Sequence, residues 1–157
     1  MNSAKLLQRG QIFLATLLGV GYIPLAPGSW GSLLTFILVW FLLPDNFYLL
    51  GGAALIVFFV SIWSADGAEK VFGKDNRKIV IDECTGMLVS FLFLPKEFFL
   101  YILAYVIFRI LDVVKPPPIK KLEEIKGGLG ITLDDVVAGI YTNLILQVLI
   151  LLRILGT

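Results

Sequence analysis

Five apolar segments separated by short polar breaks restrict this chain more than any other feature of its sequence. The segments are Trp30–Leu43, Phe47–Ala65, Ile79–Leu94, Phe98–Val114 and Val136–Leu152. Hydrophobic residues make up 58% of the 157 residues, and the mean hydropathy is +0.91. A soluble core of this size cannot bury so much apolar surface, so we expect the segments to lie in lipid as helices.

The lengths of these segments set the expected architecture. A straight crossing needs roughly 20 apolar residues, so we expect an all-α, polytopic membrane bundle with about four to five hydrophobic helices, some of which enter the membrane without crossing it. Residues 1–20 place Lys5 and Arg9 before an apolar patch, with no signal cleavage site, and predict a helix at the membrane surface. We expect residues 1–157 to form a single domain.

The basic residues are distributed unevenly between the two ends of such a bundle. If the chain changes sides at each apolar segment, one side holds residues 1–29, 66–78 and 115–135 together with the helix ends that adjoin them, including Arg109. Of the 13 lysines and arginines, only Lys96 and Arg153 fall on the other side. The positive-inside rule makes the basic side cytoplasmic, although a re-entrant segment would change this count.

Polar residues recur at helical spacing within three of the apolar segments. The stripes are Asp82, Gly86 and Ser90; Tyr101, Tyr105, Arg109 and Asp112; and Asp135, Gly139, Asn143 and Gln147. Lipid does not solvate such stripes, so we expect them to face neighbouring helices. This places five acidic side chains together near the cytoplasmic end: Asp82, Glu83, Asp112, Asp134 and Asp135.

Structural explanations exist for several of these residues. "TLDD" fits a capping box with Thr132 as the N-cap, and "KPPPI" fits a helix stop. Arg109 fits an ion-pair partner of Asp112. "GGLG" fits either a turn or an anion-binding nest before a helix. Asp82 and Glu83 lie inside an apolar segment, where an unpaired charge is costly, which favours a functional site.

The residue types present narrow the chemistry. Histidine is absent, and Cys84 is the single cysteine, which excludes an internal disulfide and a cysteine-built metal cluster. Clustered carboxylates are hard oxygen ligands, which select Mg²⁺, and Mg²⁺ usually meets a phosphate. A net charge of +1 with no dominant basic face argues against a nucleic-acid partner.

These features favour phosphoryl transfer on a lipid head group. Arg109, Lys115 or the lysines at 120–121 would neutralise the remaining phosphate charge. A carboxylate would act as general base on a water molecule or attack phosphorus itself, and the sequence leaves both routes open.

Four motifs resemble those of one enzyme family. "GYIPLAPGSWGS", "IVIDECTGM", "FRILDVVKPPPI" and "GGLGITLDDVVAG" occur in the order found in the A-type phosphatidylglycerophosphate phosphatases, and the resemblance extends from Gly19 to Ala138. It implies Mg²⁺-dependent removal of the terminal phosphate of phosphatidylglycerophosphate, which gives phosphatidylglycerol. It also implies a multi-pass protein of the bacterial inner (cytoplasmic) membrane with its active site at the cytoplasmic interface.

Carried over by motif, the resemblance implies the residues of the site. The implied catalytic residues are Asp82, Glu83, Asp112, Lys115, Asp134 and Asp135, with Asp75 as a further acid. We assign Mg²⁺ to Asp82, Glu83, Asp134 and Asp135, and the substrate to Arg109, Ser29, Gly128 and Lys120. Departures from the family pattern at Pro117 and Thr132 bear on lipid preference more than on activity, and Ser29 keeps the hydroxyl of the threonine usual at its position.

Two other classes remain as alternatives. "ADGAEK" at residues 65–70 partly matches the motif of CDP-alcohol phosphotransferases, but Glu69 stands where that motif needs an arginine. A carboxylate-based ion transporter would place its acids near the middle of the bilayer, whereas these acids lie near one end. The sequence leaves the oligomeric state open.

Overall fold

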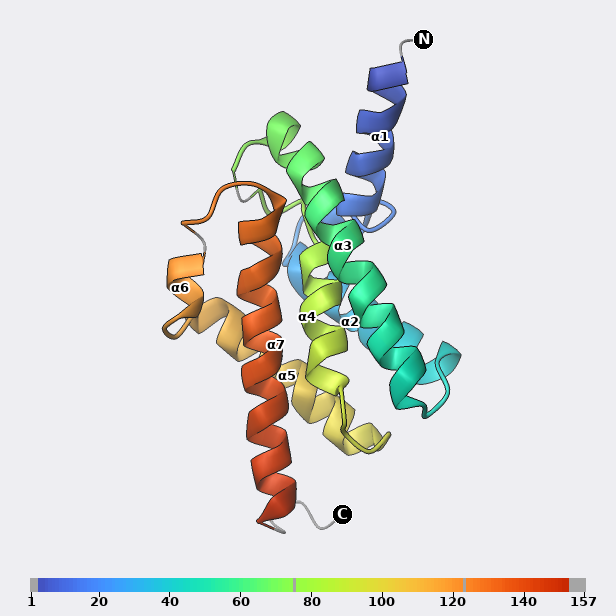
Figure 1. Cartoon of the computed structure of the whole chain (residues 1–157), viewed down its shortest axis with the longest axis vertical. Helices are drawn as coiled ribbons and strands as arrows, with labels where there is room; N and C mark the ends of the chain where they lie inside the picture. Colours follow the sequence, from blue (N-terminus) through green and yellow to red (C-terminus); the bar gives the residue numbers. More distant parts are fainter. Residues whose placement is uncertain (1–2, 75, 123, 153–157) are drawn as a thin grey trace.

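The computed structural model describes residues 3–74, 76–122 and 124–152, and all regular secondary structure within them is helical. This confirms the all-α prediction for the described residues. Along the chain the elements are α1 (Ser3–Ala15), the 3-10 turn η1 (Val20–Tyr22), α2 (Pro27–Leu42), α3 (Phe47–Phe72), α4 (Ile81–Phe91), α5 (Phe98–Val114), α6 (Ile119–Leu122) and α7 (Gly128–Leu151) (Figure 1).

Helix α4 is the core of the bundle. It packs against α2, α3, α5 and α7, and α7 is its most extensive neighbour (Figure 1). Nearly all of its 11 residues are buried, including Met87 and Phe91. Phe91 stacks on Tyr101 of α5 with 4.1 Å between the ring centroids, so Tyr101 is a packing residue. Because α4 is enclosed by protein, its apolar composition reflects a core position.

The polar stripes of α4 and α7 pack against each other. Gly139 of α7 lies so close to α4 that an added Cβ would collide with the carbonyl oxygen of Gly86. One turn further on, the Asn143 side-chain amide donates to the carbonyl oxygens of Ser90, at 3.1 Å, and Leu92. The prediction that these stripes face neighbouring helices is therefore confirmed. Small residues permit the close approach, and the buried amide is hydrogen-bonded.

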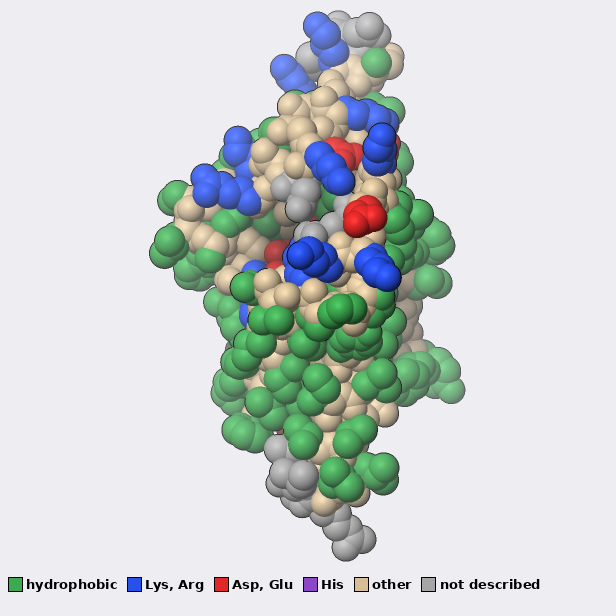
Figure 2. All heavy atoms as spheres, turned by 90° about the vertical axis from the view of Figure 1, so that its left-hand side faces the viewer, with side chains coloured by type: hydrophobic (Ala, Val, Ile, Leu, Met, Phe, Trp, Pro, Cys, Tyr) green, Lys and Arg blue, Asp and Glu red, His purple; other side chains and the backbone are tan. Residues whose placement is uncertain are grey.

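The predicted count of four to five membrane helices is not confirmed. By length and composition, α3 and α7 are the two described helices that suit a membrane crossing. Helices α2, α4 and α5 have 16, 11 and 17 residues and fall short of the roughly 20 that a straight crossing needs. Figure 2 shows lysine and arginine side chains gathered at the end of the molecule that carries α1, with apolar side chains covering most of the remaining surface on this face.

The largest differences from the expected helix boundaries are at α3, α7 and the N-terminal helix. α3 continues past Ala65 to Phe72, where Asp66 and Lys70 form an ion pair of 2.6 Å one turn apart. α7 begins at Gly128 instead of Val136. The N-terminal helix ends at Ala15, because Leu17 and Leu18 adopt positive φ angles of 48° and 57°.

The capping-box interpretation of Thr132 is wrong. Thr132 lies inside α7, where its hydroxyl donates to the Gly128 carbonyl oxygen at 2.8 Å and lies 2.8 Å from the Ser61 hydroxyl of α3. The first residues of α7 precede the apolar segment that begins at Val136. They are nevertheless helical, because they are buried against other helices. Asp134 and Asp135 are consequently held in the second turn of a helix and are not its caps.

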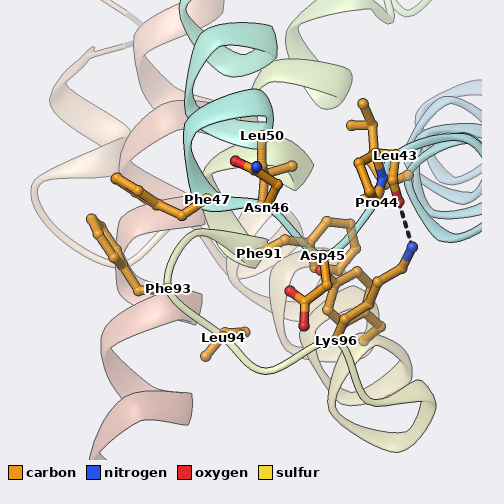
Figure 3. Close-up of a pocket in the computed structure, with 12 residues that line it drawn as sticks. Leu43, Pro44, Asp45, Asn46, Phe47, Leu50, Phe91, Phe93, Leu94 and Lys96 are labelled. Carbon is orange, nitrogen blue, oxygen red and sulfur yellow. Dashed lines mark hydrogen bonds between the residues drawn. The ribbon is translucent and has the colours of Figure 1, made fainter.

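A small pocket lies where α2 and α4 end and α3 and α5 begin, at the end of the bundle opposite the start of α4 (Figure 3). It has a volume of about 50 Å³ and is lined by the α2–α3 connection, including Asp45 and Asn46, and by Phe91 and Lys96. The Asn46 side-chain oxygen caps α3 by accepting from the backbone N–H groups of Tyr48 and Leu49, at 2.9 and 3.2 Å. Lys96 donates to the Leu43 carbonyl oxygen. The hydrogen bonds here serve helix capping and loop packing.

Candidate active site

A polar pocket of about 340 Å³ lies where the ends of four helices meet. Its walls come from the start of α2, the α3–α4 connection, the first turn of α4, the end of α5 and the second turn of α7. It brings together all six residues expected to be catalytic: Asp82, Glu83, Asp112, Lys115, Asp134 and Asp135. Arg109 also lines it.

Two cations hold three of the five carboxylates. The Arg109 guanidinium pairs with Glu83 and, at 3.1 Å, with Asp112, so it joins α5 to α4. Lys115 Nζ lies 3.0 Å from Asp134 Oδ2 and joins the end of α5 to α7. Lys115 itself ends α5 in a left-handed conformation with φ of 48°. "KPPPI" thus stops the helix, as one interpretation held, and also places a lysine in the pocket.

The other two carboxylates are buried with an oxygen left over. Asp82 and Asp135 are 8% and 3% exposed. Among the described residues, Oδ1 of each has no hydrogen-bond partner. Burying a carboxylate oxygen without a partner destabilises the folded protein by several kcal/mol. These two atoms are therefore the candidates for binding a cation.

The donor set fits a hard divalent cation. Glu83, Asp112 and Asp135 each offer a carboxylate oxygen, and these oxygens lie within 4.8 Å of one another. All are oxygen ligands, which suit Mg²⁺ better than zinc or copper. The five acids of the pocket outnumber its three basic residues, Arg77, Arg109 and Lys115. One divalent cation would offset this excess of negative charge.

Burial also changes the acidity of the carboxylates on α4, which lies outside the two candidate spans. Desolvation raises the pKa of Asp82 well above its usual range, and the charges of Glu83 and Asp134 add to this. Desolvation raises the pKa of Glu83 to about 7, although Arg109 opposes the rise. A bound divalent cation would favour the ionised forms and reverse both shifts.

The family model described as "Phosphatidylglycerophosphatase A" matches residues 13–150 of the chain, which include this whole pocket. The chain belongs to this family. It is therefore a phosphatase, and the resemblance carried by the four sequence motifs is confirmed.

Curated relatives agree with this membership and cover most of the chain. A Bacteroides thetaiotaomicron protein provisionally named a phosphatidylinositol-3-phosphatase is 38% identical over 87% of this chain and 91% of its own length. Phosphatidylglycerophosphatase A of Escherichia coli is 37% identical over 81% of this chain and 76% of its own. The Haemophilus influenzae protein of the same name is 34% identical over 84% and 83%. No solved structure gives a significant match.

Some residues expected to bind substrate in this phosphatidylglycerophosphatase A family member lie outside the acidic pocket. Gly128 packs on the backbone of α3, where an added Cβ would meet the Ile62 carbonyl oxygen. Lys120 is exposed on α6. Ser29 lines a neighbouring groove together with Arg109. Asp75, the further acid implied by the resemblance, lies outside the described residues.

The sequence analysis did not identify Gly28, Asn76 and Arg77, which line the pocket, or Ser32, which contacts Glu83. Ser32, at the edge of the pocket, donates its hydroxyl to Glu83 Oε2 at 3.1 Å, and Gly28 lies against the other oxygen of the same carboxylate. Asn76 and Arg77 line the pocket from the α3–α4 connection. "PGSWGS" carried the signal for the first two, since it places Gly28 and Ser32 four residues apart on one helical face.

Cys84 does not line the pocket. It is buried and accepts a hydrogen bond from the Thr35 hydroxyl at 2.9 Å. Burial raises the pKa of its thiol to about 12, so it does not supply a thiolate nucleophile at neutral pH.

We expect Gly28→Ala to lower activity by about 10- to 100-fold, the range seen when groups that orient metal ligands are changed. The new methyl group would meet the Glu83 carboxylate and force it away from Ser32 and Arg109. Because a flexible carboxylate can give way, the variant should still fold. Steady-state phosphate release and thermal unfolding measure the two effects.

Gly51→Ala is the matched control for this substitution. Gly51 lies in α3, and no described atom lies within 4 Å of a Cβ added there. It should keep wild-type activity. Equal activity in the two variants would show that the position of Glu83 does not matter for turnover.

Proposed function

We propose that this protein hydrolyses the terminal phosphate of phosphatidylglycerophosphate in a Mg²⁺-dependent reaction that yields phosphatidylglycerol and orthophosphate. The observation that carries the proposal is the pocket of five carboxylates beside Arg109 and Lys115, in which two carboxylates have a buried oxygen without a hydrogen-bond partner among the described residues. The names of the Escherichia coli and Haemophilus influenzae relatives support the substrate.

Charge explains why such a pocket needs a metal to accept a phosphate. A phosphate monoester carries up to two negative charges, and the pocket already holds more acids than bases. We assign Mg²⁺ to Asp82 and Asp135 through their unpartnered oxygens, with Glu83 and Asp112 beside them. Bound there, Mg²⁺ would polarise the phosphoryl group and lower the pKa of a water molecule. Asp134, also assigned to the metal from the sequence, forms an ion pair with Lys115.

The chain's own residues orient the substrate and handle the protons. Arg109 and Lys115 lie in the pocket as donors to the phosphoryl oxygens, and their ion pairs with Glu83, Asp112 and Asp134 fix their positions. In the direct route, water oxygen bonds to phosphorus, the bond from phosphorus to the glycerol oxygen breaks, and that oxygen takes up a proton. A carboxylate of the pocket accepts the proton that the water loses. In the two-step route, a carboxylate oxygen bonds to phosphorus while the bond from phosphorus to the glycerol oxygen breaks and that oxygen takes up a proton. Water then attacks the phosphorylated carboxylate, which frees the carboxylate and orthophosphate.

One relative favours a second substrate. The Bacteroides thetaiotaomicron protein is provisionally named a phosphatidylinositol-3-phosphatase. Phosphatidylinositol 3-phosphate also presents a phosphate monoester on a lipid head group, so the same pocket chemistry would serve it. Parallel assays of the two lipids decide between them, and a higher kcat/KM on the inositol lipid would overturn the proposed substrate.

We expect phosphate release from phosphatidylglycerophosphate in detergent micelles to vanish with EDTA and to return when Mg²⁺ is added in excess. The reason is that the pocket's excess of carboxylates over basic residues repels the substrate phosphate when no cation is present. A protein that stays folded in EDTA and keeps its full rate would exclude the metal. A folded protein with Mg²⁺ that releases phosphate from neither lipid would overturn the function itself.

The alternatives from the sequence receive no support. "ADGAEK" lies in α3, where Asp66 pairs with Lys70 and lines no part of the acidic pocket. Membership in a phosphatase family likewise disfavours a transporter. We further propose that the protein crosses the bacterial inner membrane several times with the acidic pocket at the cytoplasmic face, which the basic side chains at one end support (Figure 2).

A further inference from the structure

An apolar groove lies directly beside the acidic pocket, between the start of α2 and the outer face of α5. Its volume is about 420 Å³, and it is lined by Ser29, Tyr105, Val106, Arg109, Ile110, Val113 and Val114. Its four aliphatic residues are all exposed. The Tyr105 hydroxyl donates to the Ser29 carbonyl oxygen at 3.4 Å, which ties the two walls together.

The groove and the acidic pocket share two residues. Arg109 and Val113 line both. The Arg109 guanidinium pairs with Glu83 and Asp112 inside the pocket. A ligand whose phosphate binds beside Arg109 therefore finds its nearest apolar surface in this groove, on the exposed side of α5.

We propose that this groove binds the part of a substrate acyl chain closest to the head group and so selects lipid phosphates over water-soluble ones. This inference rests on the proposed function, because it takes the lipid phosphate to be in the acidic pocket. We infer the occupant from the fact that the groove is continuous with the acidic pocket. A single molecule with a phosphate monoester at one end and hydrocarbon at the other fits the pocket and the groove together. A water-soluble phosphate has no hydrocarbon to place in the groove, so contacts made there favour the lipid.

Filling the groove tests the proposal. We expect Ile110→Trp to raise the KM for dioleoyl phosphatidylglycerophosphate about tenfold, with kcat little changed. The deacylated head group, glycerophosphoglycerophosphate, serves as a competitive inhibitor in the same assay. Its inhibition constant should be the same for the variant and the wild type, because it reaches the acidic pocket without the groove.

Ile56→Trp provides the matched control. Ile56 lies on α3 and does not line the groove, and its exposure of 66% is comparable to the 55% of Ile110. It should change neither constant, which separates groove filling from the general effect of an added tryptophan on an outward face. Thermal unfolding of both variants checks that each is folded.

The outcomes are separable. An unchanged KM in folded Ile110→Trp, or an inhibition constant that rises as much as the KM, would overturn the groove and leave the proposed function standing. A wild-type protein that does not hydrolyse the lipid would overturn the proposed function first.

A photoactivatable acyl chain on the same lipid gives a second, independent test of the groove. Crosslinks at Val106 or Ile110 that persist in excess phosphatidylcholine would support the groove. The absence of such crosslinks would oppose it.

Discussion

Asp135→Asn is expected to lower phosphatidylglycerophosphate hydrolysis by at least about 10²- to 10³-fold, the cost of removing one well-placed electrostatic group in other active sites. The substitution keeps the size of the side chain but removes the charge from a carboxylate whose Oδ1 is buried and has no partner among the described residues. We assign this oxygen to the metal. Asp82→Asn should behave in the same way, for the same reason.

The stability of Asp135→Asn should move in the opposite direction. In metal-free solution the wild-type pocket holds Asp135 close to Glu83 and Asp112, with oxygens of all three within 4.8 Å of one another. Removing one of these charges relieves repulsion, so thermal unfolding in EDTA should occur at the same or a higher temperature than in wild type. Excess Mg²⁺ should stabilise the wild type more than the variant.

Asp45→Asn is the control for this pair of measurements. Asp45 lies in the small pocket at the opposite end of the bundle (Figure 3), which shares no lining residue with the acidic pocket. It should retain wild-type turnover. Full activity in Asp135→Asn, or equal losses in Asp45→Asn and Asp135→Asn, would contradict the metal assignment.

Gly139→Ala is expected to destabilise the bundle and to reduce activity together. A methyl group at this position would meet the carbonyl oxygen and Cα of Gly86, which are backbone atoms and cannot rotate away. Overpacking of this kind costs about 1–3 kcal/mol, which exceeds the helix propensity gained by replacing glycine with alanine. Because α7 would shift on α4, Asp135 would also move relative to Asp82 and Glu83.

Gly52→Ala makes the same chemical change without the collision. It lies inside α3, with no described atom within 4 Å of an added Cβ, so it should leave stability unchanged or slightly higher. Thermal unfolding in detergent and phosphate release are measured on both variants. A Gly139→Ala protein as stable and active as Gly52→Ala would show that the two helices do not need this close approach.

The stripes of polar residues could be predicted from the sequence because helical spacing fixes which side chains share a face. Asp82, Gly86 and Ser90 on one helix and Asp135, Gly139 and Asn143 on another have the same spacing, and lipid accepts neither stripe. The structure packs the two stripes together and places the acids at one end. The acidic residues that line the pocket could therefore be predicted from the sequence.

Helix lengths and supporting contacts could not be predicted in the same way. Apolar composition located the lipid-compatible part of α7 but not its start, because the polar residues from Gly128 onward are buried by α3 and α4. The composition of α4 resembled that of a short membrane segment, although α4 is enclosed by protein. The contacts of Gly28 and Ser32 with Glu83 join positions more than fifty residues apart, which local spacing does not reveal.

The position of the groove on the outer face of α5, next to a pocket at the basic end of the bundle, has a consequence for how a reaction cycle ends. Under the proposed function, the diacyl product would diffuse away laterally in the plane of the bilayer. Orthophosphate would leave into the aqueous phase. The two products would thus leave by different routes. Accumulation of either product would slow the enzyme independently of the other.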